Sequence, residues 1–186
     1  MNNNIKHVYH GSPIGSLKTI KPSLSTHGES YVYGTIHRIL ALLFLQSWND
    51  FIFNVAYGDD GVLEITERYK LALEDIYSGK SGYIYTLDGG TFTSGTTPFE
   101  GEVVSQNEVK VINEEKVDDI LAEILELEKN KELRINRYPK RHPDIPEDDS
   151  DLVEEAIYFY RKGKKDTVEY CISKHPHLKD RFKELE

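Results

Sequence analysis

Over the first 112 residues, short stretches of apolar and β-branched residues alternate with polar ones. A period of two is typical of strands with one buried face. Glycine, proline and aspartate residues separate the stretches and mark turns between them. The pattern predicts strands at Ile5–His10, Tyr31–Thr35, Phe51–Tyr57, Gly61–Ile65, Tyr83–Leu87, Glu102–Ser105 and Val109–Ile112.

Three stretches have the apolar spacing of helices instead. Ile36–Trp48 is apolar over most of its surface, which indicates a helix packed on several sides, with Thr35 as its N-cap. Glu67–Tyr77 and Val117–Lys129 are predicted as two further helices, the latter clearly amphipathic. Strands interspersed with few helices predict an α+β fold, in which two small sheets pack on each other with helices at the margins.

The character of the chain changes after residue 130. Segment 131–149 contains three of the seven prolines and alternating basic and acidic clusters, which predicts a linker or extended arm. Residues 150–186 then carry apolar positions at helical spacing, with short helices expected at Asp151–Lys162, Thr167–Ser173 and Leu178–Leu185. We therefore expect one domain at 1–130, a linker at 131–149 and a helical C-terminal segment at 150–186. This segment is too short to bury its apolar residues alone, so it should dock on the body or on a partner, the body being the simpler choice.

Composition limits the possible functions. The chain has 186 residues and 38% hydrophobic content, enough for one ordinary core, and its net charge of −9 lacks the basic excess of most nucleic-acid-binding proteins. Residues 1–50 carry a small excess of positive charge, with four basic and two acidic side chains. The single cysteine, Cys171, excludes an intramolecular disulfide and a cysteine-based zinc site, and we expect no metal.

The sequence also bears on location. Residues 1–4, Met-Asn-Asn-Asn, are polar and have no signal-peptide pattern. The longest apolar run, Ile39–Leu45, is far shorter than the ~20 residues that span a bilayer. We therefore expect a cytoplasmic protein with no membrane partner.

Several common site types are poorly supported. Gly79-Lys80-Ser81 has the ending of a phosphate-binding loop, but position 74 is Glu where that loop needs Gly. The pair His175 and His177 has no cysteine nearby and makes a poor metal site. A short basic cluster could touch a phosphate backbone, although the acidic run Glu147-Asp148-Asp149 beside it makes a self-compensating linker equally reasonable; the cluster consists of Arg137, Lys140, Arg141 and His142.

One ordered trio of motifs is more informative. Tyr9-His10-Gly11 closes the first strand, Tyr31-Val32-Tyr33-Gly34-Thr35 forms the second, and Glu102-Val103-Val104-Ser105 opens a late strand with an acid. This order resembles the ADP-ribosyltransferase superfamily, in particular the diphtheria-toxin and poly(ADP-ribose) polymerase branch with its His-Tyr-Glu signature. The resemblance covers residues 5–112 and implies a split-sheet core that encloses a cleft for NAD.

The resemblance also implies roles for individual residues. His10 would hydrogen-bond a ribose hydroxyl of NAD, the Gly11 backbone would pair with the nicotinamide amide, and Ser12 would belong to the same binding segment. An aromatic ring would stack on nicotinamide, with Tyr33 matching the pattern best and Tyr31 matching in another register. Glu102 would support the oxocarbenium-like transition state that forms when the bond between nicotinamide and ribose breaks. Glu100 and Glu108 are the alternatives for this acid.

Each of these residues also has an ordinary structural interpretation. His10 can be a strand-end histidine satisfied by a neighbouring carbonyl, the tyrosines can be plain strand residues, and Glu102 can be a solvated charge. The preferred hypothesis is an enzyme that consumes NAD and transfers ADP-ribose to an unknown protein or nucleic-acid acceptor. A catalytically inactive member that only binds is the main alternative.

A third hypothesis is an RNA 2'-phosphotransferase, a relative within the superfamily. The strand at Gly82–Leu87 followed by the Glu102 strand resembles these enzymes, which use a second histidine and arginines to engage the RNA phosphate. Here only His37 and Arg38 follow the second strand, and a surface pair at a helix start explains them more simply.

Overall fold

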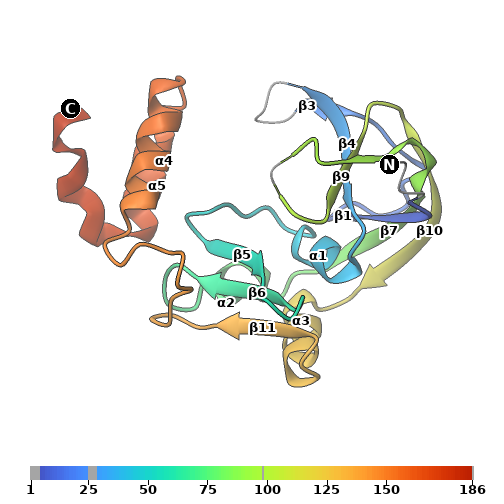
Figure 1. The fold of residues 1–186 in the computed structure, drawn as a ribbon, viewed down its shortest axis with the longest axis horizontal. Coiled ribbons are helices and arrows are strands. Elements are labelled where there is room, and N and C mark those ends of the chain that lie inside the picture. Colours follow the sequence, from blue (N-terminus) through green and yellow to red (C-terminus); the bar gives the residue numbers. More distant parts are fainter. Residues whose placement is uncertain (1–4, 25–28, 98, 186) are drawn as a thin grey trace.

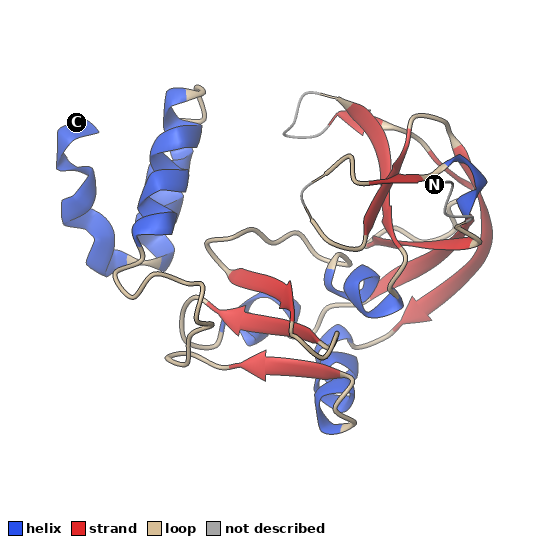
Figure 2. Cartoon of the chain, viewed as in Figure 1, coloured by secondary structure: helices blue, strands red, loops and turns tan. Residues whose placement is uncertain are grey.

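The larger of two sheets is antiparallel and has the strand order β2-β10-β7-β1-β4-β9-β8, with β3 paired to the first residues of β4 (Figures 1 and 2). The computed structural model describes residues 5–24, 29–97 and 99–185. The residues 1–4 on which the signal-peptide expectation rests lie outside this description. The strands of the sheet are β1 (His7–Ser12), β2 (Thr19–Ile20), β3 (Ser23–Leu24), β4 (Ser30–Thr35), β7 (Gly82–Asp88), β8 (Thr93–Ser94), β9 (Glu102–Ser105) and β10 (Val109–Val117).

The junction between β1 and β4 is the weakest seam of this sheet. On one side β1 pairs with β7 along its whole length, and on the other β4 pairs with β9 from Val32 to Thr35. Between β1 and β4, by contrast, the register in the described residues consists of Tyr9 opposite Thr35. In the described residues, the backbone pairing that joins the two halves of the sheet is thus limited to this one pair.

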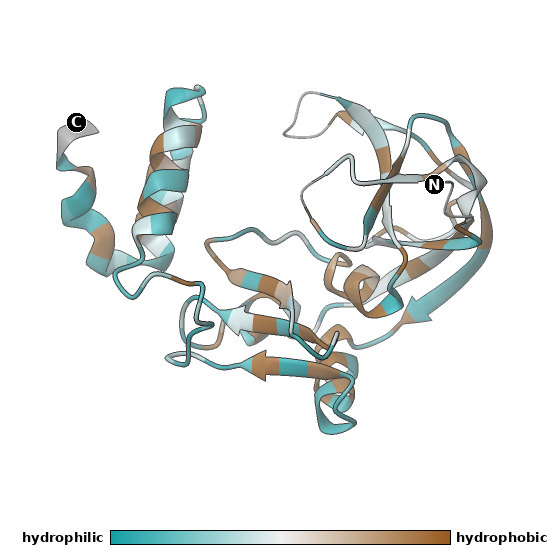
Figure 3. Cartoon of the chain, in the orientation of Figure 1, coloured by the Kyte–Doolittle hydropathy of each residue, from teal (hydrophilic) through white to brown (hydrophobic). Residues whose placement is uncertain are grey.

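The smaller sheet consists of β5 (Phe53–Tyr57), β6 (Leu63–Glu67) and β11 (Leu133–Asn136), in the order β11-β6-β5. Strands β5 and β6 are antiparallel, and β6 and β11 are parallel. Helices α1 (Arg38–Leu43), α2 (Ala72–Tyr77) and α3 (Ile120–Lys129) pack between and around the two sheets and share one core with them. Figure 3 shows the hydrophobic residues gathered in α1, β5, β6 and β11.

The C-terminal segment comprises α4 (Ser150–Arg161), α5 (Asp166–Lys174) and the 3-10 stretch η2 (Pro176–Leu185); a further 3-10 turn, η1, spans Gly89–Thr91. The C-terminal segment lies at one end of the molecule (Figure 1) and has its own apolar cluster, to which the body contributes Phe51. The imidazole of His175 is buried, and its Nε2 lies 2.7 Å from the carbonyl oxygen of Phe51. The C-terminal segment therefore docks on the body, around Phe51.

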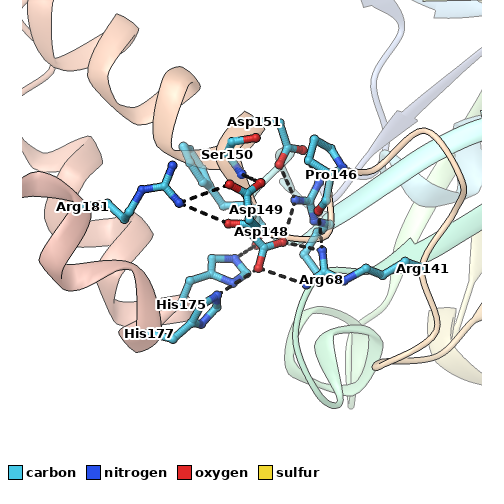
Figure 4. Close-up of polar contacts among 11 residues, drawn as sticks. Arg68, Arg141, Pro146, Asp148, Asp149, Ser150, Asp151, His175, His177 and Arg181 are labelled. Carbon is cyan, nitrogen blue, oxygen red and sulfur yellow. Dashed lines mark hydrogen bonds and ion pairs between the residues drawn. The ribbon is translucent and has the colours of Figure 1, made fainter.

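Charged side chains around the buried pair Arg68 and Asp149 stabilise this docking (Figure 4). The Arg68 guanidinium, on the body, donates to Asp149 at 3.2 Å and to Asp151 at 2.7 Å. Asp149 also accepts from Arg141 at 2.6 Å and lies 2.9 Å from Nε2 of His177. These contacts lower the pKa of Asp149 to about 2 against the opposing effect of burial. Arg137 pairs with Glu128, so the arginines of the basic cluster at 137–142 are compensated within the chain.

The mixed α+β class is confirmed, and the main differences concern element boundaries. The helix predicted at 36–48 ends at Leu43, because the Leu43 carbonyl accepts hydrogen bonds from Trp48 Nε1 at 3.1 Å and from the Tyr77 hydroxyl at 2.8 Å. These side chains occupy the acceptor that the amide of Ser47 would need to continue the helix.

Other element boundaries were also wrong. The helix predicted at 67–77 starts at Ala72: Glu67 is the last residue of β6, its carboxylate accepts from the Leu73 amide at 3.0 Å, and Leu71 has a positive φ of 64°. The strand β11, at Leu133–Asn136, was not predicted; it lies within the segment 131–149. Leu133 and Ile135 alternate with polar residues, which is a strand pattern too short to stand out.

Candidate functional site

A cavity of about 440 Å³ opens at the seam between β1 and β4. Three neighbouring strands and the segment that runs from α1 to Trp48 form its walls. The lining residues are Tyr9, His10, Gly11, Pro13, Tyr33, Gly34, Thr35, Ala41, Phe44, Leu45, Gln46, Ser47, Trp48 and Glu102. The structure thus brings four of the residues singled out in the sequence, His10, Gly11, Tyr33 and Glu102, to one cavity.

His10 bridges the seam of the sheet. Its Nδ1 lies 2.8 Å from the carbonyl oxygen of Tyr33 on β4. Because a carbonyl can only accept, Nδ1 must carry the hydrogen, which leaves Nε2 as an acceptor with no partner among the described residues. Burial lowers the pKa of His10, in spite of the bond to Tyr33, and so favours the neutral ring. The interpretation of His10 as satisfied by a carbonyl is therefore correct for one nitrogen, and the other is available to a hydroxyl donor.

Gly11 is required by the packing of α1. A Cβ at this position would collide with the carbonyl oxygen of Ala41 and lie 3.0 Å from the backbone of Phe44. The resemblance implies that a nicotinamide amide approaches the Gly11 backbone, which a side chain would hinder. The structure adds a second reason for glycine, the close approach of helix α1. This contact sets the position of Phe44, which lines the cavity.

The two tyrosines of β4 take different places. Tyr33 lines the cavity, and its hydroxyl is buried without a hydrogen-bond partner in the described chain. Tyr31 lies outside this cavity and lines a separate depression with Thr93 and Gln106. The two rings pack edge to face, with their centroids 5.9 Å apart. Of the two, only Tyr33 is placed to stack on a ligand in the cavity.

Glu102 starts β9 directly opposite Thr35 and is half-buried in the cavity wall. Gly101 before it has a positive φ of 81°, and a Cβ there would lie 2.8 Å from the ring of His37. Glycine thus allows the sharp turn that begins β9 at Glu102. Of the two alternative acids, Glu100 is exposed. Burial, the larger cause, and the charge of Glu100 together raise the pKa of Tyr57 to about 12. Glu108 pairs with Lys21 at 3.7 Å.

Three other candidates from the sequence lie outside the cavity. The Ser12 side chain is buried, and its Oγ accepts from the amide of Ile14 at 3.1 Å, so it stabilises the turn after β1. Arg38 pairs with Glu115 and Glu123, which leaves its guanidinium neutralised. The ring of His37 packs against Tyr57, with centroids 5.2 Å apart. These contacts provide structural roles for all three residues.

The sequence did not single out the aromatic wall of the cavity. The rings of Phe44 and Trp48 are stacked, with centroids 5.3 Å apart, and Phe44 is 38% exposed although its neighbours Leu43 and Leu45 are buried. The exposure of Phe44 is a property of the structure, and the sequence carried no signal for it. In the sequence these residues were part of a predicted helix and therefore of its packed surface.

A second cavity, of about 650 Å³, adjoins the first and shares Phe44, Trp48 and Glu102 with it. It extends from this shared wall to α4 and α5, which the sequence placed outside the resemblance to a known family.

Comparisons with protein-family models, with curated proteins and with solved structures find no match. Within residues 5–24, 29–97 and 99–185, no helix is long and apolar enough to cross a membrane. In the same residues, no group of three or more His, Cys, Asp or Glu side chains is arranged to hold a metal ion.

Proposed function

We propose that this chain is an ADP-ribosyltransferase that cleaves the bond between nicotinamide and ribose in NAD and transfers ADP-ribose to an acceptor. The observation that carries the proposal is the common cavity of His10, Gly11, Tyr33 and Glu102, which come from three adjacent strands. The junction of the sheet at Tyr9 and Thr35 supports the further proposal of a split-sheet core of the ADP-ribosyltransferase type.

The cavity has the chemical groups that this reaction needs. Nε2 of neutral His10 can accept from a ribose hydroxyl, and the Tyr33 ring offers a flat surface for nicotinamide. When the glycosidic bond breaks, its electron pair goes to the pyridinium nitrogen and positive charge develops on the ribose. A carboxylate at Glu102 stabilises that charge most when it appears, which is in the transition state. The acceptor then forms the new bond to the anomeric carbon and loses a proton.

Nicotinamide release from NAD by the purified protein tests the proposal. NAD at 100 times its dissociation constant should also raise the free energy of unfolding by about 2.7 kcal/mol, because it binds only the folded state. Stabilisation without nicotinamide release would identify an inactive member that binds the nucleotide. Absence of both effects at millimolar NAD would overturn the proposal.

A further inference from the structure

The second cavity is bounded by parts of the chain that are distant in sequence. On one side lie the segment from Phe44 to Phe51 and the loop between β8 and β9, and on the other lie α4 and α5. Figure 1 shows the segment between α1 and β5 extending toward α4. The lining consists of Phe44, Trp48, Asn49, Asp50, Phe51, Thr97, Phe99, Glu102, Glu155, Phe159, Lys164, Asp166, Thr167 and Tyr170. Glu102 is therefore at the boundary of both cavities, and a molecule in the second would lie next to it.

This lining combines aromatic rings with an excess of negative charge. The lining contains one ammonium group, that of Lys164, and four carboxyl groups, those of Asp50, Glu102, Glu155 and Asp166. Six aromatic rings form much of the remaining wall. The Lys164 ammonium lies over the Phe159 ring, 4.7 Å from its centroid. This cation–π contact shows that a ring of the aromatic wall already binds a cation of the chain. Aromatic faces and carboxylates together are suited to an organic cation.

Asp50 and Glu155 have no cation of their own. No hydrogen bond or ion pair engages either carboxyl in the described part of the chain, and the nearby guanidinium of Arg68 is bound by Asp149 and Asp151. Burial, with the charges of Asp50 and Asp151, raises the pKa of Glu155 to about 7 against the opposing effect of Arg68. Burial likewise raises the pKa of Asp50. The Thr97 hydroxyl in the same wall is buried and has no hydrogen-bond partner among the described residues.

We propose that the second cavity is the acceptor site and that the acceptor it receives is a guanidinium group, such as an arginine side chain. The inference rests on the proposed function and names its second substrate. A planar guanidinium can stack on an aromatic ring and donate to carboxylates at its edge, which matches this wall better than a compact ammonium does. A polyanion such as nucleic acid would meet the excess of carboxylates. The exposed basic turn Arg161–Lys165 contributes only Lys164 to the cavity.

Transfer to a guanidinium exchanges one bond at the anomeric carbon of the ribose for another. An acceptor nitrogen forms a bond to the anomeric carbon of the ribose, and the bond from that carbon to nicotinamide breaks, so that neutral nicotinamide leaves. The acceptor nitrogen gives up one proton. Glu155, in its ionised form opposite the guanidinium, takes that proton and releases it to solvent.

Binding of N-acetyl-arginine amide, measured without NAD by calorimetry, tests the site independently of turnover. N-acetyl-citrulline amide, the uncharged analogue of the same shape, should bind at least about tenfold more weakly. Glu155→Gln should weaken binding of the arginine derivative at least about tenfold, because it removes a charge-assisted contact. Glu154→Gln is the matched control, since Glu154 is the exposed neighbour on the same helix and does not line the cavity. Equal binding of both derivatives, or equal effects of both substitutions, would overturn the assignment.

Transfer of ADP-ribose completes the test. With NAD present, the wild-type protein should modify the arginine derivative and leave the citrulline derivative and a mixed oligonucleotide unmodified. The ratio of arginine modification to nicotinamide release should fall in Glu155→Gln and stay constant in Glu154→Gln. Nicotinamide release with modification of the oligonucleotide, or of none of the three, would sink the guanidinium assignment and leave the proposed function standing. Failure to bind or cleave NAD would reject the proposed function itself.

Discussion

Neutral His10 and the carboxyl of Glu102 are expected to act at different moments of the proposed reaction. His10 is fixed by its bond to the Tyr33 carbonyl, so Nε2 presents a preformed acceptor before any bond breaks. A contact to a ribose hydroxyl exists both in bound NAD and in the transition state. The charge that Glu102 would oppose is fully developed only in the transition state. Kinetics of single substitutions can therefore separate the two roles.

His10→Ala should weaken NAD binding and lower kcat/KM, each by up to about tenfold, the effect of one lost hydrogen bond. Glu102→Gln should lower kcat by about 10² to 10³ and change KM little. Steady-state nicotinamide release measures both, and the thermal midpoint of each variant shows whether the fold is retained. Glu100→Gln is the control because Glu100 is exposed and outside the cavity. A loss of turnover in Glu100→Gln together with full activity in Glu102→Gln would show that the catalytic acid is Glu100 and not Glu102.

The raised pKa of Glu155 makes a second prediction, on stability. In the unfolded chain this carboxyl ionises near its ordinary pKa of 4.5, whereas in the fold it ionises at about 7. Ionisation is thus less favourable in the folded state, and the fold loses stability as pH rises from about 4.5 through 7. Glu155→Gln should raise the free energy of unfolding at pH 8 by about 1–2 kcal/mol, less than the full shift implies because the carboxyl keeps some contact with solvent.

Denaturant unfolding at pH 4 and pH 8 measures this difference. Below pH 4.5 the wild-type carboxyl is protonated in both states, so the gain should vanish. Exposed Glu154, changed to Gln, should give no gain at either pH. A gain of equal size at both values would point to a packing effect of Gln rather than to the charge. A confirmed gain would mean that the wild-type chain keeps a destabilising carboxylate in the second cavity, as functional sites often do.

Among the elements, α1 connects the seam of the sheet to the aromatic wall of both cavities. Its backbone rests directly on Gly11, and it leads into Phe44 and Trp48. Because the contact is between backbone atoms, it cannot be relieved by a rotamer change. The position of the aromatic wall therefore depends on one residue of β1.

Gly11→Ala should displace α1 and destabilise the fold by about 1–3 kcal/mol, the usual cost of overpacking a core. NAD binding should weaken as well, because the displaced helix carries part of the cavity wall. Thermal unfolding with and without NAD measures both effects. Gly90→Ala is the control: there the nearest atom to a new Cβ is the end of the Asp88 side chain at 3.0 Å, which can move. Unchanged stability in Gly11→Ala would contradict the close approach of α1.

The strands were predictable from the sequence where alternation was long enough, as in β1, β4, β7 and β9. Four candidate residues, His10, Gly11, Tyr33 and Glu102, come to one cavity because the three motifs lie on strands that become neighbours, whereas Phe44 and Trp48 were not singled out. The end of α1 was not predictable, since it depends on the Tyr77 hydroxyl and the Trp48 indole reaching the Leu43 carbonyl. Strand β11 was missed because Leu133–Asn136 pairs with β6, which lies about 70 residues earlier. Tertiary contacts of this kind leave no local pattern.

At the scale of the whole molecule, the apolar spacing predicted α4 and α5 of the C-terminal segment but not their contribution to a cavity. The prediction that this segment docks on the body is confirmed by Phe51, His175 and the contacts of Arg68. The segment docks at one wall of the second cavity because of the buried contacts Arg68–Asp149 and His175–Phe51. The spacing of apolar residues in the sequence does not predict these contacts. The division into a domain at 1–130, a linker and a C-terminal segment stays a prediction.

Deleting residues 150–186 separates the roles of the two cavities. The first cavity is lined by residues from Tyr9 to Glu102, whereas the second loses Glu155, Phe159 and its α5 wall. Phe51 becomes exposed and Arg68 loses Asp151, so the free energy of unfolding should fall by about 2–3 kcal/mol through the apolar surface of Phe51 alone. The truncated chain should still be stabilised by NAD, but it should no longer bind N-acetyl-arginine amide. If instead it kept full stability and the affinity for the arginine derivative, the C-terminal segment would be an independent arm, and the acceptor site would have to lie within the body.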